Sequence, residues 1–197
     1  IRKGRSFGGC IRYVTQKGDA KLIASEGGLR GTAEEMAQSF RWQCLLNPDV
    51  AKPVGHIALS FKPEDAPRLT DAFMTRLAGE YLELMGIRNT QFIVVRHHGT
   101  DNPHCHIVFN RVDFDGKVIS DSNDFRRNEK VTKMLKDKYS LTYSEGKQSV
   151  KTEKLHASEK VKYEIYRAVK EALRSADTWK EFQNKLLKMG VDMELKY

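Results

Sequence analysis

The sequence predicts an α+β protein built on an antiparallel sheet of ferredoxin-like type, with helices on one face of the sheet and a helical C-terminal extension. Strand and helix patterns alternate twice in the first hundred residues, and a hairpin signal, Asp115-Gly116, follows the last strand. From Asp121 onward the hydrophobic pattern is mainly helical. We therefore expect a core over residues 1–120 and a basic helical extension over 121–197 that packs on it within one domain.

The N-terminal quarter of the chain predicts two helices. The segment IRKGRSFGGCIRYV predicts a strand end or turn that leads into a short helix, and the glycine-rich SEGGLRG predicts a loop up to residue 31. Thr32 and Glu35 are spaced as a capping box, so a second helix begins there and Asn47-Pro48 ends it.

The middle of the chain predicts strands on both sides of a long helix. HIALSF at 56–61 predicts a strand, and apolar residues at helical spacing predict an amphipathic helix from Ala66 to Met85. Two further strands are expected over 91–97 and 104–112.

The end of the chain predicts one more strand and then helices. Because Asp115-Gly116 is typical of a hairpin turn, the segment KVIS that follows is expected to pair back as a short fourth strand. The remainder divides into predicted helices over 123–139, 158–175 and 178–189, with a polar loop over 140–157.

Composition narrows the class of protein. The 197 residues carry a net charge of +8, which favours a polyanionic partner. No apolar run approaches the roughly 18 residues of a membrane span, and no secretory signal is visible, so we expect a cytoplasmic protein without membrane insertion. Three cysteines without C-x-x-C spacing argue against a disulfide framework. Because the sequence opens with Ile1 rather than Met, we expect a piece of a longer protein.

Four of the six histidines fall within His97–His106. On a strand, residues two apart point to the same face, so His104 and His106 project side by side about 7 Å apart along the backbone. Such a pair suits a metal ion, and the turn before it can fold a third imidazole back beside the pair. From the residues alone this third ligand is His97 or His98.

The string H-x6-H-x-H, with Asp-Asn-Pro before its second histidine and the apolar strand IVFN after it, resembles the metal-binding motif of conjugative DNA relaxases. These mobilisation proteins belong to the HUH endonuclease superfamily, whose histidine-hydrophobe-histidine core here has Cys105 at its centre. The resemblance favours His97 over His98 as first ligand. It also implies a nucleophilic tyrosine near the N-terminus, where Tyr13 lies.

The resemblance implies a reaction. A relaxase nicks one DNA strand at the transfer origin of a plasmid or mobile element through tyrosine attack, which leaves a 5′-phosphotyrosyl intermediate and a free 3′-hydroxyl, and it can rejoin the strand. A phenol has a pKa of about 10, so tyrosine is a poor nucleophile near neutral pH. A divalent cation, Mg²⁺ or Mn²⁺, would favour the phenolate and neutralise the charge that develops on the phosphate. Tyr139 and Tyr143 are rival nucleophiles. His56 is either a residue that orients this site or an ordinary strand-end histidine.

The implied partner is single-stranded DNA at a transfer origin, together with accessory mobilisation proteins and a secretion coupling protein in a bacterial cytoplasm. Between Lys117 and Arg174 the sequence has fifteen Lys or Arg against nine Asp or Glu, an excess of six. The residues expected to contact DNA are Arg2, Lys3, Arg5 and Arg12, which flank Tyr13, and Arg126 and Arg127.

Two other functions remain open from the sequence. One is an HUH rolling-circle replication initiator or transposase, although these more often place the tyrosine on a helix after the histidines. The other is a non-catalytic DNA-binding module that a metal ion stabilises. A covalent protein–DNA product distinguishes the enzymes from the binding module.

Overall fold

The computed structural model describes residues 1–16, 18–143 and 157–194. The chain forms two compact units, Ile1–Ser144 and Glu145–Tyr197, and each is considered by itself. Most of the predicted loop over 140–157 lies outside the described residues.

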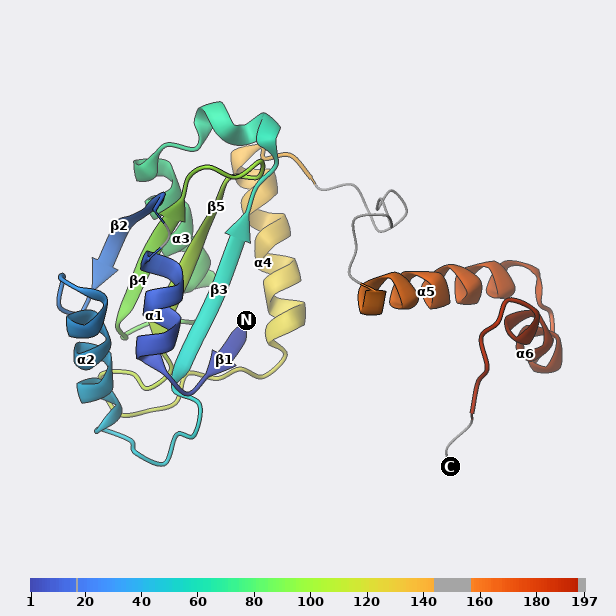
Figure 1. Ribbon diagram of the computed structural model, residues 1–197, viewed down its shortest axis with the longest axis horizontal. Coiled ribbons are helices and arrows are strands. Elements are labelled where there is room, and N and C mark those ends of the chain that lie inside the picture. Colours follow the sequence, from blue (N-terminus) through green and yellow to red (C-terminus); the bar gives the residue numbers. More distant parts are fainter. Residues whose placement is uncertain (17, 144–156, 195–197) are drawn as a thin grey trace. The chain divides into compact units, whose positions relative to one another are not determined.

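The first unit is built on a five-stranded sheet in the order β1-β3-β5-β4-β2, and every neighbouring pair is antiparallel (Figure 1). The predicted α+β class with an antiparallel sheet is confirmed. The strands are β1 (Arg2–Gly4), β2 (Ala20–Glu26), β3 (Val54–Ser60), β4 (Phe92–His97) and β5 (His104–Asn110). The helices of this unit are α1 (Phe7–Thr15), α2 (Ala33–Cys44), the 3-10 helix η1 (Pro63–Arg68), α3 (Asp71–Leu84) and α4 (Asp124–Tyr139).

Helices cover both faces of the sheet, whereas the sequence predicts them on one face (Figure 1). Helices α3 and α4 pack on one face and α1 and α2 on the other. The cause lies in the strands themselves, since neighbours such as Ile93 and Val94 point to opposite faces and both are fully buried. A continuous apolar run is typical of a strand buried on two sides.

Two strand predictions need correction. Strand β2 is absent from the prediction because it is an edge strand, partly exposed, with a register shift between Leu22 and Ala24 that breaks the alternating pattern. The expected fourth strand KVIS forms a single bridge, Val112 to Val118. It cannot join the sheet beside β5, because β3 and β4 already occupy both edges of that strand.

The long helix begins later than its hydrophobic pattern predicts. Pro67 lies inside η1, and the Thr70 side chain then accepts the Phe73 N–H and caps α3. Residues of β3, β5 and α3 form one hydrophobic core, which includes Tyr81 and Phe109. Both of these side chains are almost fully buried.

Helix α4 belongs to the first unit. Its Val131 and Leu135 are buried in the core on the face of the sheet that α3 also covers. This part of the predicted extension thus packs on the core, while the division at residue 120 and the placement of the remainder stay predictions.

The second unit contains the two predicted helices, α5 (Ala157–Ser175) and α6 (Trp179–Lys188). Its small core consists of Ala168, Ala172, Phe182 and Leu186. Thr178 caps α6 by accepting the Glu181 N–H. Among the described residues no helix is long and apolar enough to cross a membrane.

Candidate active site

Three histidines converge where β4 and β5 meet. His97 is the last residue of β4 and lies opposite His104, the first residue of β5. His106 follows on the same face of β5, opposite Val95. This face is the one that α1 and α2 cover, since Val95 packs in their core. The strand register therefore builds the cluster.

The cluster has dimensions that a metal ion could use. Each of the three side chains offers one ring nitrogen, and these nitrogens all lie within 4.8 Å of one another. His97 and His106 are buried, with exposed fractions of 2% and 7%. His98 is exposed and lies outside the cluster. Three imidazoles with an accessible side are typical of a catalytic metal site that retains open positions.

Backbone carbonyls determine the tautomers of two of these rings. His97 Nε2 lies 2.8 Å from the Val14 carbonyl oxygen, and His104 Nδ1 lies 3.1 Å from that of Asn102. A carbonyl only accepts, so those two nitrogens carry the protons. The remaining nitrogens, His97 Nδ1 and His104 Nε2, then face each other as lone pairs 3.2 Å apart. Such a contact is repulsive unless a cation binds there, so the donor set fits a metal ion.

Thr100 reinforces this arrangement. Its hydroxyl donates to the Asn102 carbonyl at 2.8 Å and lies 3.2 Å from His104 Nδ1. The turn between the two strands therefore orients the ring of His104. Sequence reasoning missed the Val14 carbonyl, because a main-chain acceptor leaves no signal in the sequence, and it did not single out the Thr100 hydroxyl.

His56 on β3 contacts the third ring. Its Nε2 lies 2.9 Å from His106 Nδ1, and the two ring centroids are 5.0 Å apart. Burial, followed by the positive charges of Arg2 and the N-terminal amino group, lowers the pKa of His56. A neutral His56 can accept a hydrogen bond from His106 Nδ1, which directs His106 Nε2 away from β3.

Tyr13 lies beside the histidines. Its ring centroid is 5.9 Å from that of His106 and 6.1 Å from that of His56, with edge-to-face geometry in both pairs. The side chain comes from the last turns of α1 and is 58% exposed, so a large substrate can reach it.

The two rival tyrosines have other partners. The Tyr139 hydroxyl donates to Glu80 at 2.6 Å, and the Tyr143 hydroxyl donates to Asp137 at 2.6 Å. The hydrogen bond to Asp137 also raises the pKa of Tyr143. Tyr139 packs against Phe73 of α3, on the face of the sheet opposite the histidines.

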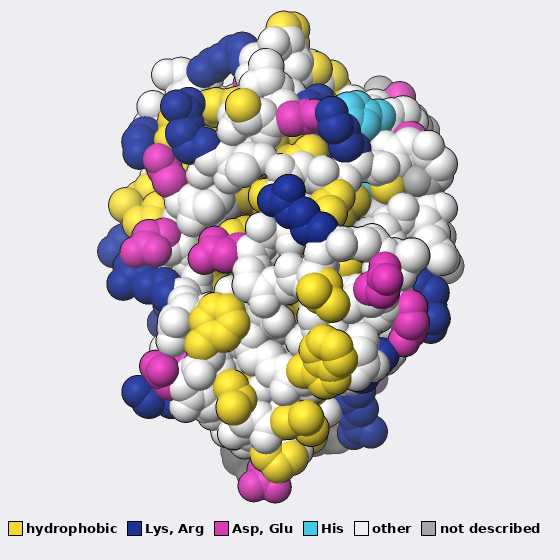
Figure 2. Space-filling model, turned by 90° about the vertical axis from the view of Figure 1, so that its left-hand side faces the viewer, with side chains coloured by type: hydrophobic (Ala, Val, Ile, Leu, Met, Phe, Trp, Pro, Cys, Tyr) yellow, Lys and Arg dark blue, Asp and Glu magenta, His cyan; other side chains and the backbone are white. Residues whose placement is uncertain are grey.

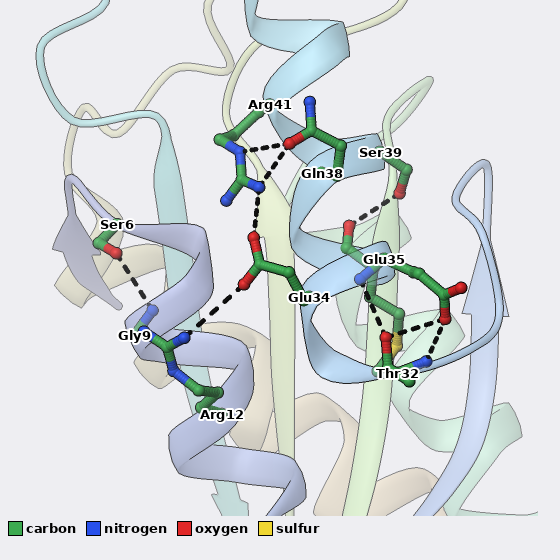
Figure 3. Close-up of polar contacts among 10 residues, drawn as sticks. Ser6, Gly9, Arg12, Thr32, Glu34, Glu35, Gln38, Ser39 and Arg41 are labelled. Carbon is green, nitrogen blue, oxygen red and sulfur yellow. Dashed lines mark hydrogen bonds and ion pairs between the residues drawn. The ribbon is translucent and has the colours of Figure 1, made fainter.

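The basic residues expected near Tyr13 differ in their surroundings. Arg2 is exposed and lies opposite His56 in the β1–β3 register, and Arg5 is exposed as well. Lys3 points to the other face, where it pairs with Asp121 at 2.5 Å, and the hydrogen bond to that carboxylate raises the pKa of Lys3. Arg12 faces α2 and pairs with Glu34 at 3.7 Å (Figure 3).

The two arginines of α4 also differ. Arg126 is exposed. The Arg127 guanidinium donates to the carbonyls of Met85 and Ser120, so it joins the end of α3 to the start of α4. Figure 2 shows histidine side chains reaching the surface at one end of the viewed face, with Lys and Arg side chains beside them.

An antiparallel sheet that carries three converging histidines beside an exposed tyrosine is the arrangement that the resemblance to HUH endonucleases predicts. The comparison with protein-family models matches residues 13–141 to the relaxase family, described as MobA/VirD2-like, nuclease domain. The match covers more than half of the chain, so the protein belongs to this relaxase family, and DNA nicking is the function that membership supports. Neither the curated proteins nor the solved structures yielded a match.

Proposed function

We propose that the protein nicks one strand of DNA at the transfer origin of a plasmid or mobile element, with Tyr13 as the nucleophile. The observation that carries this proposal is the position of the Tyr13 ring, about 6 Å from the rings of His56 and His106 and open to solvent. The other tyrosines that competed for the role, Tyr139 and Tyr143, donate to carboxylates instead.

The chemical step is a transesterification. The Tyr13 oxygen attacks a backbone phosphorus and loses its proton, while the bond from phosphorus to the 3′ oxygen breaks and that oxygen takes up a proton. The products are a 5′-phosphotyrosyl protein and a free 3′-hydroxyl. One phosphodiester replaces another, so the reverse attack by the 3′-hydroxyl rejoins the strand.

His97, His104 and His106 would hold the divalent metal ion. When bound there, such an ion polarises a non-bridging phosphate oxygen and offsets the charge that develops at phosphorus. Mg²⁺ and Mn²⁺ are the expected ions. We expect Mn²⁺ to bind more tightly, because Mg²⁺ prefers oxygen ligands and three imidazole nitrogens suit it poorly.

We assign His56 a positioning role. Its contact with His106 Nδ1 supports this role, because a partner on the second ring nitrogen determines which nitrogen faces the metal. Among the basic residues, Arg2, Arg5, Arg12 and Arg126 are exposed and so are placed to reach phosphates, although Arg12 also pairs with Glu34 at the surface. Lys3 and Arg127 reach DNA only by giving up contacts within the fold.

Covalent capture tests this function. The protein is incubated with single-stranded origin oligonucleotides and Mn²⁺, the denatured mixture is separated, and the DNA-linked peptide is identified by mass spectrometry. We expect a 5′-linked product on the peptide that contains Tyr13. Strand cleavage without any covalent product would contradict tyrosine chemistry, and binding without cleavage would favour a non-catalytic DNA-binding module.

A further inference from the structure

Helices α1 and α2 bring two arginines to one carboxylate, on the face of the sheet that carries the histidines (Figure 3). Glu34 Oε1 accepts a hydrogen bond from Arg41 at 2.6 Å, and Glu34 Oε2 lies 3.7 Å from Arg12 Nη1. All three side chains are exposed. A single carboxylate therefore bridges two guanidinium groups, and one positive charge is left in excess.

Each of the two guanidinium groups also has a nitrogen that the carboxylate does not use. Arg12 Nη2 and Arg41 Nη1 lie 3.7 Å and 3.9 Å from the point that a Cβ atom of residue 8 would occupy, and that residue is Gly8. Within the described residues neither nitrogen has a hydrogen-bond or ion-pair partner. Two N–H donor groups thus converge over a position without a side chain.

The pair of arginines suits a phosphate. A guanidinium donates two parallel hydrogen bonds to the oxygens of a carboxylate or of a phosphate, so the two anions are interchangeable partners. The hydrogen bond from Arg41, and then the charge of that residue, lowers the pKa of Glu34, so the bridging carboxylate is ionised. Exposed ion pairs are weak, and a phosphate can therefore displace Glu34.

The two arginines lie close to the proposed nucleophile. Arg12 directly precedes Tyr13 on α1, and the next residue, Val14, accepts the hydrogen bond from His97 that joins this helix to the sheet. Arg41 comes from α2, which packs with α1 in one hydrophobic core. A phosphate between these arginines would therefore be held at a fixed position relative to Tyr13.

We propose that Arg12 and Arg41 bind a backbone phosphate of single-stranded DNA, close to the phosphate that Tyr13 attacks, and that Glu34 holds the two arginines until DNA displaces it. This inference rests on the proposed function. It adds Arg41 to the residues that bind DNA and makes Glu34 a competitor of the DNA.

The salt dependence of DNA binding tests the proposal. The affinity for a labelled single-stranded oligonucleotide of mixed sequence is measured over a salt series, with EDTA present so that binding is separated from cleavage. Arg41→Gln should make the slope of log K against log salt shallower by about 0.7, because one phosphate contact is lost. Arg88→Gln is the matched control, because Arg88 is exposed and pairs with Glu83 at 2.7 Å. Its slope should equal that of the parent.

The acidic partners give a second comparison. Glu34→Gln should raise the affinity by about two- to fivefold, because DNA no longer has to break an exposed ion pair. Glu83→Gln makes the same charge change away from the site and should leave the affinity at the value of the parent.

Equal slopes for the Arg41 and Arg88 variants, or equal affinities for the two Glu variants, would overturn the inference. Those results together with a covalent product on Tyr13 would remove this site and leave the proposed function. A shallower slope for Arg41→Gln without any covalent product in the parent would keep the phosphate site and contradict the proposed function.

Discussion

His97 Nε2 lies 2.8 Å from the carbonyl oxygen of Val14, the residue that follows Tyr13 on α1. This hydrogen bond joins the helix that carries the proposed nucleophile to a proposed metal ligand, although 83 positions of sequence separate Val14 from His97. Val14 is fully buried, so the end of α1 is held against the sheet. Packing therefore holds the end of α1, which carries Tyr13, in place relative to the histidines.

The first prediction concerns the nucleophile. Tyr13→Phe removes the hydroxyl and keeps the ring that contacts His56 and His106, so the covalent product should vanish while oligonucleotide affinity stays close to that of the parent. Gel detection of the covalent product, with affinity measured by fluorescence anisotropy, checks both outcomes. Tyr139→Phe serves as the control and should still form the product. A product in Tyr13→Phe would exclude this assignment.

The histidine motif was predictable from sequence because its geometry is local. His97, His104 and His106 belong to two strands joined by a short turn, so strand alternation and one reversal bring them together. The resemblance supplied the choice between His97 and His98, and it also supplied Tyr13. Neither can be obtained from spacing alone, because the distance from α1 to the sheet depends on tertiary packing.

The remaining features depend on register between distant strands. His56 meets His106 because of the β3–β5 pairing, which a single sequence does not specify. Edge strand β2 lacks a clear alternating pattern and so escapes prediction. The two-sided burial of Ile93 and Val94 is visible as an apolar run, but the same run would also fit one covered face and a buried helix segment.

The second prediction concerns metal binding. His97→Ala should weaken Mn²⁺ binding strongly, because it removes one of three ligands and leaves His104 Nε2 without its neighbour. His98→Ala is the matched control and should bind Mn²⁺ as the parent does, since His98 is exposed and lies outside the cluster. Isothermal titration calorimetry measures the Mn²⁺ affinity of both variants and of the parent. The reverse order of affinities would transfer the ligand role to His98.

The third prediction concerns His56. His56→Leu removes the acceptor for His106 Nδ1 and should lower Mn²⁺ affinity by about 10–100-fold, the usual effect of losing a partner of a metal-bound histidine. His56→Gln retains an acceptor oxygen and should recover most of that affinity. Circular dichroism melting of each variant shows whether the fold is kept. If the Leu variant binds Mn²⁺ like the parent, His56 has no positioning role.

The fourth prediction separates the two arginines of α4. Arg126 is exposed, so Arg126→Ala should weaken DNA binding without lowering the stability of the fold. If Arg126 contacts a phosphate, the slope of log K against log salt should become shallower by about 0.7 for single-stranded DNA.

Arg127→Ala should instead lower stability by about 1–2 kcal/mol, because the guanidinium donates to the carbonyls of Met85 and Ser120. Affinities over a salt series and thermal melting of both variants give the two quantities. Identical slopes for Arg126→Ala and the parent would show that this part of α4 is a solvated face, and the phosphate contacts would then be sought at Arg2 and Arg5.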